Sequence, residues 1–95
     1  MDELTLSRIE ALVEQIDDLA IFLAEVEATA TEYGFIIDSL NGQLEKESEL
    51  TQRYYLRGAI SRLQSDIAIA KRQAIAVEHN REVYSMRLAE LTATS

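Results

Sequence analysis

Apolar residues recur at alternating intervals of three and four positions through most of the chain, and this spacing constrains the fold more than any other feature. The first series is apolar throughout: Ile9, Leu12, Ile16, Leu19, Leu23, Val26, Ala30, Tyr33, Ile37, Leu40 and Leu44. The second series has one polar member: Leu56, Ile60, Leu63, Ile67, Ala70, Ala74, Val77, Arg81, Tyr84, Leu88 and Leu91. Such heptad spacing places each series on one face of a helix that packs against another helix.

The first series loses its spacing after residue 44 and the second begins at residue 56, which predicts a turn between two helices. The dipeptide Asn41-Gly42 is typical of a helix C-terminus, because glycine adopts the left-handed conformation that ends many helices. We therefore expect an all-α fold, a long antiparallel helical hairpin that forms a single domain over residues 1–95. Its helices span about 4–41 and about 50–92, and its turn spans about 42–49. The chain contains no proline and three glycines, which suits long helices.

The helix ends leave alternatives open. The first helix begins between Asp2 and Arg8, with Thr5 or Ser7 as a cap and Glu10 at the capping-box distance from Ser7. Ser48 and Thr51 are the alternatives for the cap of the second helix. Gly34 is either an interior helical glycine or a helix end, and the uninterrupted apolar spacing around it favours the interior position.

Several large apolar residues lie outside the two series. They are Ile21, Phe22, Phe35, Ile36, Ile69 and Ile75. Two helices alone bury only part of their surfaces, and exposed apolar patches usually mark an interface. We therefore expect two chains to associate as a homodimer, forming a four-helix, coiled-coil-like bundle in which these six residues contribute to the interface.

Charge is unevenly distributed along the chain, whose net charge is −8. Residues 1–42 carry ten acids and one base, whereas residues 43–95 carry seven acids and eight bases. The first helix therefore presents an acidic face that includes Glu14, Asp17, Asp18, Glu25 and Glu32. This face either attracts the more basic half of the chain or is simply solvated.

Arg81 is the one charged residue within either apolar series. A polar residue in a helical seam can fix the register and the oligomeric state. Pairing with Glu10 or Glu14 of the first helix would serve that role. Alternatively, the arginine stem extends past the seam so that the guanidinium reaches water.

Residues with the chemistry of an active site are sparse. His79 and Glu82 have the reverse order of a Glu-x-x-His metal motif, and a solvent-facing histidine explains them better. No cysteine, phosphate-binding glycine loop or nucleophile motif is present, so we expect no catalytic residue, metal or cofactor. The longest apolar run has six residues, whereas a membrane span needs about 20. Together with the acidic N-terminus, which is unlike a secretory signal, this predicts a cytoplasmic protein without a membrane segment.

We therefore expect a non-enzymatic protein–protein interaction module, a small oligomeric adaptor, chaperone-like partner or regulator that recognises its partner through helix faces. One alternative is an acidic inhibitor that imitates DNA and binds a nucleic-acid-binding protein. A weaker alternative is nucleic-acid binding through the second helix, where basic residues lie near Tyr54 and Tyr55. The negative net charge makes nucleic acid an unlikely partner.

Overall fold

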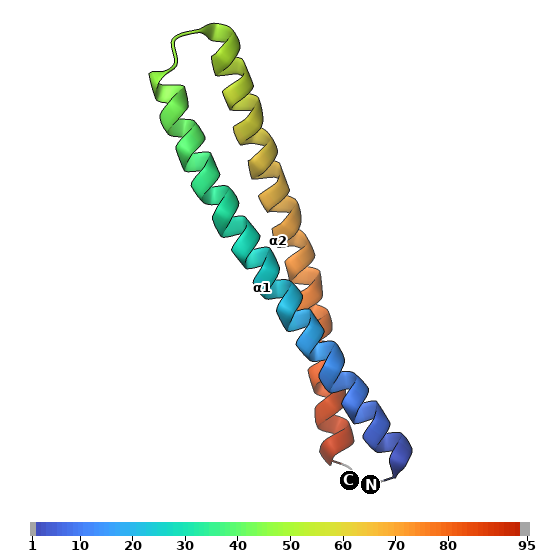
Figure 1. Ribbon diagram of the computed structural model, residues 1–95. Helices are drawn as coiled ribbons and strands as arrows, with labels where there is room; N and C mark the ends of the chain where they lie inside the picture. The colour runs from blue at the N-terminus through green and yellow to red at the C-terminus, as the bar shows by residue number, and fades with distance from the viewer. Residues whose placement is uncertain (1, 94–95) are drawn as a thin grey trace. The chain divides into compact units, whose positions relative to one another are not determined.

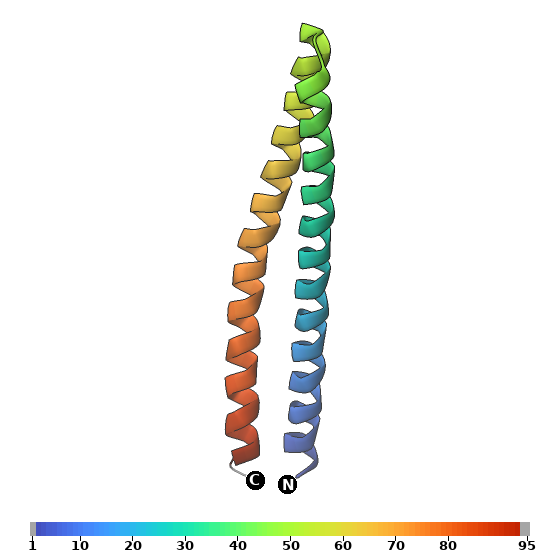
Figure 2. The same ribbon diagram turned by 90° about the vertical axis from the view of Figure 1, so that its left-hand side faces the viewer.

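The computed structural model describes residues 2–93, and it is a helical hairpin of two long helices (Figures 1 and 2). Helix α1 spans Glu3–Lys46 and helix α2 spans Leu50–Ala93, with residues 47–49 between them. No strand occurs among the described residues. The all-α hairpin expected from the two apolar series is therefore confirmed.

Contacts divide the hairpin into two units. Unit 1 comprises Met1–Glu25 and Gln73–Ser95, and unit 2 comprises Val26–Arg72 with the connection between the helices. Within each unit, a segment of α1 lies beside an antiparallel segment of α2 (Figures 1 and 2).

The two apolar series mark the packed faces of the helices. Every residue of both series is partly buried, including Arg81. Burial is nevertheless shallow, since Ile60 in unit 2, with 8% of its surface exposed, is the only buried residue among those described. The helices therefore pack through a narrow seam and do not enclose a core.

Asp2 caps the N-terminus of α1. Its Oδ1 accepts a hydrogen bond from the backbone N–H of Thr5 at 2.6 Å, and its carbonyl accepts one from Leu6 at 3.0 Å. The helix thus begins at the early end of the expected range, and neither Thr5 nor Ser7 is its cap. The bond from the Thr5 N–H lowers the pKa of Asp2 below its ordinary 3.8. The capping contribution is therefore complete above that value and is lost as the pH falls through the lowered pKa.

The expected end of the first helix at Asn41-Gly42 is wrong. Helix α1 continues for four residues past Gly42, to Lys46, and no described glycine has a positive φ. The physical reason is the apolar series, because Leu40 and Leu44 both lie on the packed face and only a continuous helix places them there. Packing thus overrides the local preference of Asn-Gly for a helix end. Helix α1 also passes without interruption through Gly34.

A side chain from α2 caps the C-terminus of α1 instead. The Nη1 atom of Arg53 donates hydrogen bonds to the carbonyl oxygens of Leu44 and Glu47, both at 2.8 Å. The last carbonyls of a helix have no partner within the helix and carry partial negative charge. The half-buried guanidinium of Arg53 donates hydrogen bonds to these oxygens and balances their charge.

The start of α2 also differs from the expectation. Since Leu50 is the first helical residue, Glu49 holds the capping position, Ser48 lies before it and Thr51 lies inside the helix. Glu47 supports this turn, because its Oε1 accepts a hydrogen bond from the backbone N–H of Glu49 at 3.1 Å. The connection is therefore three residues long and not the expected eight.

We expect Gly42→Ala to stabilise the hairpin by about 0.5–1 kcal/mol, because alanine is the better residue in a helix interior. The added Cβ has room, because no side chain and no backbone beyond its own stretch of helix lies within 4 Å of its position. Urea denaturation at fixed protein concentration measures the change, and Gly34→Ala provides a parallel helical site. A loss of stability confined to Gly42→Ala would show that this glycine ends the helix in solution.

Candidate interaction surfaces

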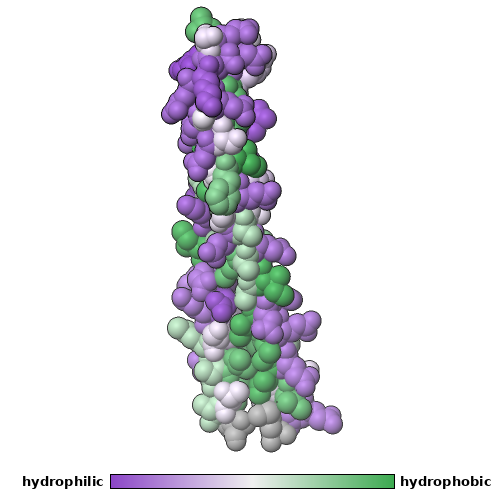
Figure 3. Space-filling model, turned by 60° about the vertical axis from the view of Figure 1, so that its left-hand side comes forward, coloured by the Kyte–Doolittle hydropathy of each residue, from purple (hydrophilic) through white to green (hydrophobic). Residues whose placement is uncertain are grey.

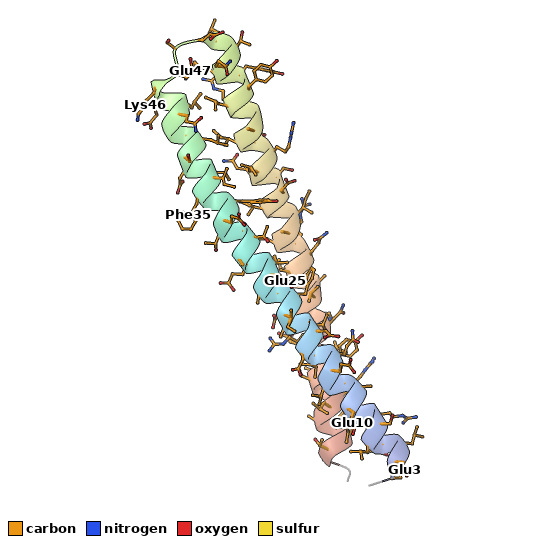
Figure 4. All side chains as sticks on the ribbon, viewed as in Figure 1. Glu3, Glu10, Glu25, Phe35, Lys46 and Glu47 are labelled. Atoms are coloured by element: carbon orange, nitrogen blue, oxygen red, sulfur yellow. The ribbon has the colours of Figure 1, made fainter. Side chains whose placement is uncertain are left out.

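The six apolar residues expected at an interface are all exposed in the single chain. Unit 1 carries Ile21, Phe22 and Ile75, and unit 2 carries Phe35, Ile36 and Ile69. Phe35 has 70% of its surface exposed and points away from the neighbouring segment of α2 (Figure 4). Water therefore contacts apolar groups in both units, and the role of these residues in an interface stays a prediction.

In unit 1, one exposed apolar residue lies beside four carboxylates. Ile21 is 58% exposed, and its neighbours on α1 at i−7, i−4, i−3 and i+4 are acidic, whereas those at i+3 and i+7 are Ala24 and Ala28. We call this set the acidic patch: Glu14, Asp17, Asp18, Ile21 and Glu25. All its members are exposed, and with Glu32 they include the whole acidic face expected from the sequence.

In unit 2, aromatic and basic side chains surround a shallow hollow on α2. We call this set the basic patch: Tyr54, Tyr55, Arg57, Gly58, Ala59 and Arg62. The rings of Tyr54 and Tyr55 meet edge to face, with centroids 5.9 Å apart, and both are largely exposed. Open space lies over Gly58, which has no side chain to fill the hollow.

A second groove lies in unit 1 between α1 and α2. Its lining includes Ala11 and Leu12 of α1 and Arg87 and Leu91 of α2. Figure 3 shows hydrophobic side chains gathered in this part of the molecule, next to the chain ends. The Arg87 guanidinium lies 5.8 Å from the centroid of the Tyr84 ring, so the cation covers part of an aromatic face.

Arg81 is half-buried in the seam of unit 1, and its Nη1 atom lies 3.4 Å from Oε1 of Glu78. This ion pair lies within α2, one turn apart, and both side chains remain partly exposed. The geometry matches an arginine whose stem lines the seam while its guanidinium reaches toward water. The ion pair shown is not the expected one with Glu10 or Glu14, and a role in setting the register stays a prediction.

The described residues assemble no group of three or more side chains that could hold a metal ion. His79 is exposed on α2. No helix within residues 2–93 has an apolar stretch long enough to cross a membrane.

No family model, curated protein or solved structure matches this chain.

The sequence pattern missed two features of these surfaces. Leu50 is 82% exposed at the start of α2, although leucine is usually buried. The sequence did indicate this exposure, because Leu50 lies outside both apolar series. The capping role of Arg53 left no signal in the spacing, because it depends on how a long side chain folds back across a three-residue connection.

Proposed function

We propose that this protein is a non-enzymatic protein–protein interaction module that functions as a homodimer, with two hairpins packed into a four-helix, coiled-coil-like bundle. The observation that supports the proposal is the shallow burial of the seam. A helix pair whose apolar series is only half-buried gains further stability when a second pair covers it.

Surface area supports the same proposal. The chain exposes 7134 Å², whereas a compact folded monomer of 10.7 kDa exposes roughly 5,500 Å². The difference is roughly 1,600 Å² per chain, about twice the area that each partner contributes to an interface of standard size. An extensive interface, such as that of a helical bundle, is therefore available without unfolding either helix.

Within this proposal, the two kinds of surface residue have different roles. Apolar side chains such as Phe35 and Ile36 provide affinity because they leave water on binding. Charged residues around them select the partner and speed its approach.

The unequal charge of the two units favours one second candidate, an acidic inhibitor that imitates DNA. Unit 1 contains ten acidic and three basic residues, a net of −7, so most of the charge lies there. Salt-sensitive capture of a DNA-binding protein, lost in a Glu14→Lys, Asp18→Lys variant, would support this candidate over the first.

Sedimentation equilibrium at micromolar concentration tests the homodimer, and we expect the wild type to have twice the mass of one chain. Phe35→Asp should raise the dissociation constant about 30-fold or more, because a charge replaces an apolar anchor of the interface. Helicity should persist, since Phe35 makes little contact within its own chain. Asn41→Asp, which adds the same charge at an exposed position on a different face of α1, is the matched control. A monomeric wild type would refute the proposal.

A further inference from the structure

We infer that the acidic patch of each chain docks on the basic patch of a second copy, so that unit 1 of one chain meets unit 2 of the other. This inference rests on the proposed homodimer and specifies its orientation. It depends on two patches that lie in different units and are complementary in both polarity and charge.

The acidic patch has an apolar centre and an anionic rim. Ile21 projects from the outer surface of α1, and four carboxylates occupy the neighbouring positions of the same helix face. Glu25, labelled in Figure 4, belongs to this rim and is exposed. Such a surface fits a partner with an apolar or aromatic centre and a cationic rim.

The basic patch has these properties. Tyr54 and Tyr55 provide exposed aromatic surface beside the hollow over Gly58, which leaves room for a projecting aliphatic side chain such as Ile21. Arg57 and Arg62 lie on either side of this glycine along α2. Arginine is suited to this role because its planar guanidinium pairs with carboxylates and stacks on aromatic rings.

Net charge distinguishes between the two orientations of a dimer. Pairing like units would place the −7 of unit 1 against another −7, which is repulsive. Pairing unlike units avoids this repulsion, because unit 2 has seven acids and six bases, a net of −1, and it places the four carboxylates of the acidic patch against the two arginines of the basic patch. The orientation with unlike units together is therefore favoured electrostatically.

Symmetry then gives two equivalent contacts. Each chain offers both patches, so a two-fold axis brings the acidic patch of each copy onto the basic patch of the other.

A charge-exchange experiment tests the orientation. One variant carries Arg57→Glu and Arg62→Glu, and the other carries Asp18→Lys and Glu25→Lys. All four positions are exposed, so the hairpin should keep its helicity. The arginine variant alone should dimerise about tenfold more weakly or worse, because carboxylates then face carboxylates at both contacts, whereas the lysine variant reduces the charge of the acidic patch from −4 to zero and should also dimerise more weakly. An equimolar mixture should dimerise more tightly than either variant alone, because one contact of the heterodimer keeps the wild-type residues and the exchanged charges meet at the other.

Two further measurements complete the test. A Lys71→Glu, Arg72→Glu variant makes the same charge change on α2 outside the basic patch, and it should weaken the dimer much less. The wild-type dissociation constant should rise with added salt, because screening weakens the contacts between the patches.

The outcomes separate this inference from the proposed function. The orientation would be wrong, and the homodimer would stand, if the wild type dimerised and neither charge variant raised the dissociation constant. The same conclusion would follow if the mixture dimerised no more tightly than the variants alone. A monomeric wild type would overturn both. If the arginine variant lost binding to single-stranded nucleic acid and kept its dimer, the basic patch would serve a different partner and the inference would be wrong.

Discussion

Ile60→Asp should unfold unit 2. Ile60 is the only buried residue among those described, so the substitution removes its burial and places a charge in the seam between the helices. Loss of a buried aliphatic side chain together with an unpaired charge costs about 3–5 kcal/mol. Because small domains have only about 5–15 kcal/mol of total stability, we expect circular dichroism to show much lower helicity and an earlier thermal transition.

Ile69→Asp is the matched control, since it changes the same residue type on the same helix at an exposed position. It should keep the helicity of the wild type and affect only self-association. Full helicity and unchanged melting for Ile60→Asp would contradict the assignment of the second apolar series to the packed face.

Arg53→Ala should destabilise the hairpin by about 2 kcal/mol. The substitution leaves the carbonyl oxygens of Leu44 and Glu47 without the two 2.8 Å hydrogen bonds that they accept from Nη1. Charged donors make bonds worth about 1.5–3 kcal/mol, and partial exposure at this site reduces the total. Urea denaturation at constant protein concentration measures the loss.

Two companion variants distinguish the hydrogen bonds of the Arg53 cap from the effect of losing a positive charge. Lys71→Ala removes an exposed cation from the same helix and unit and should change stability by less than about 0.5 kcal/mol. Arg53→Lys keeps the charge but has a single ammonium in place of the guanidinium, so it should recover only part of the stability. Equal losses for Arg53→Ala and Lys71→Ala would show that the cap contributes nothing specific.

The fold was largely predictable because the burial that stabilises it follows a regular period in the sequence. Burial of one helix face requires apolar residues every three or four positions, and every member of both series, from Ile9 to Leu91, is partly buried. Even Arg81 kept its place in the seam, because the other members of the series hold the helix face in position.

The helix ends were less predictable because local backbone preferences compete there with tertiary packing. Asn41-Gly42 favours a helix end by itself, but ending α1 there would remove Leu44 from the packed face. Arg53 then provides the cap from the other side of the connection, and no spacing rule reveals such a long-range contact.

The interaction surfaces were predictable only in part. The sequence identified Ile21 and Phe35 as apolar residues off the seam, and the structure shows that they are exposed. It also identified the acids of the first helix and the arginines beside Tyr54. The structure added the grouping of these residues into the acidic patch and the basic patch, in different units.

The division into two units has a consequence for the order of folding. Unit 2 is continuous in sequence, and its helical segments are joined by only three residues, so little loop-closure entropy opposes their first contact. The segments of unit 1 are separated by the whole of unit 2, and bringing them together first would close a much longer loop. We expect the helices to pair first next to the Arg53 cap and then progressively toward the termini, so that the strongly acidic unit 1 forms last.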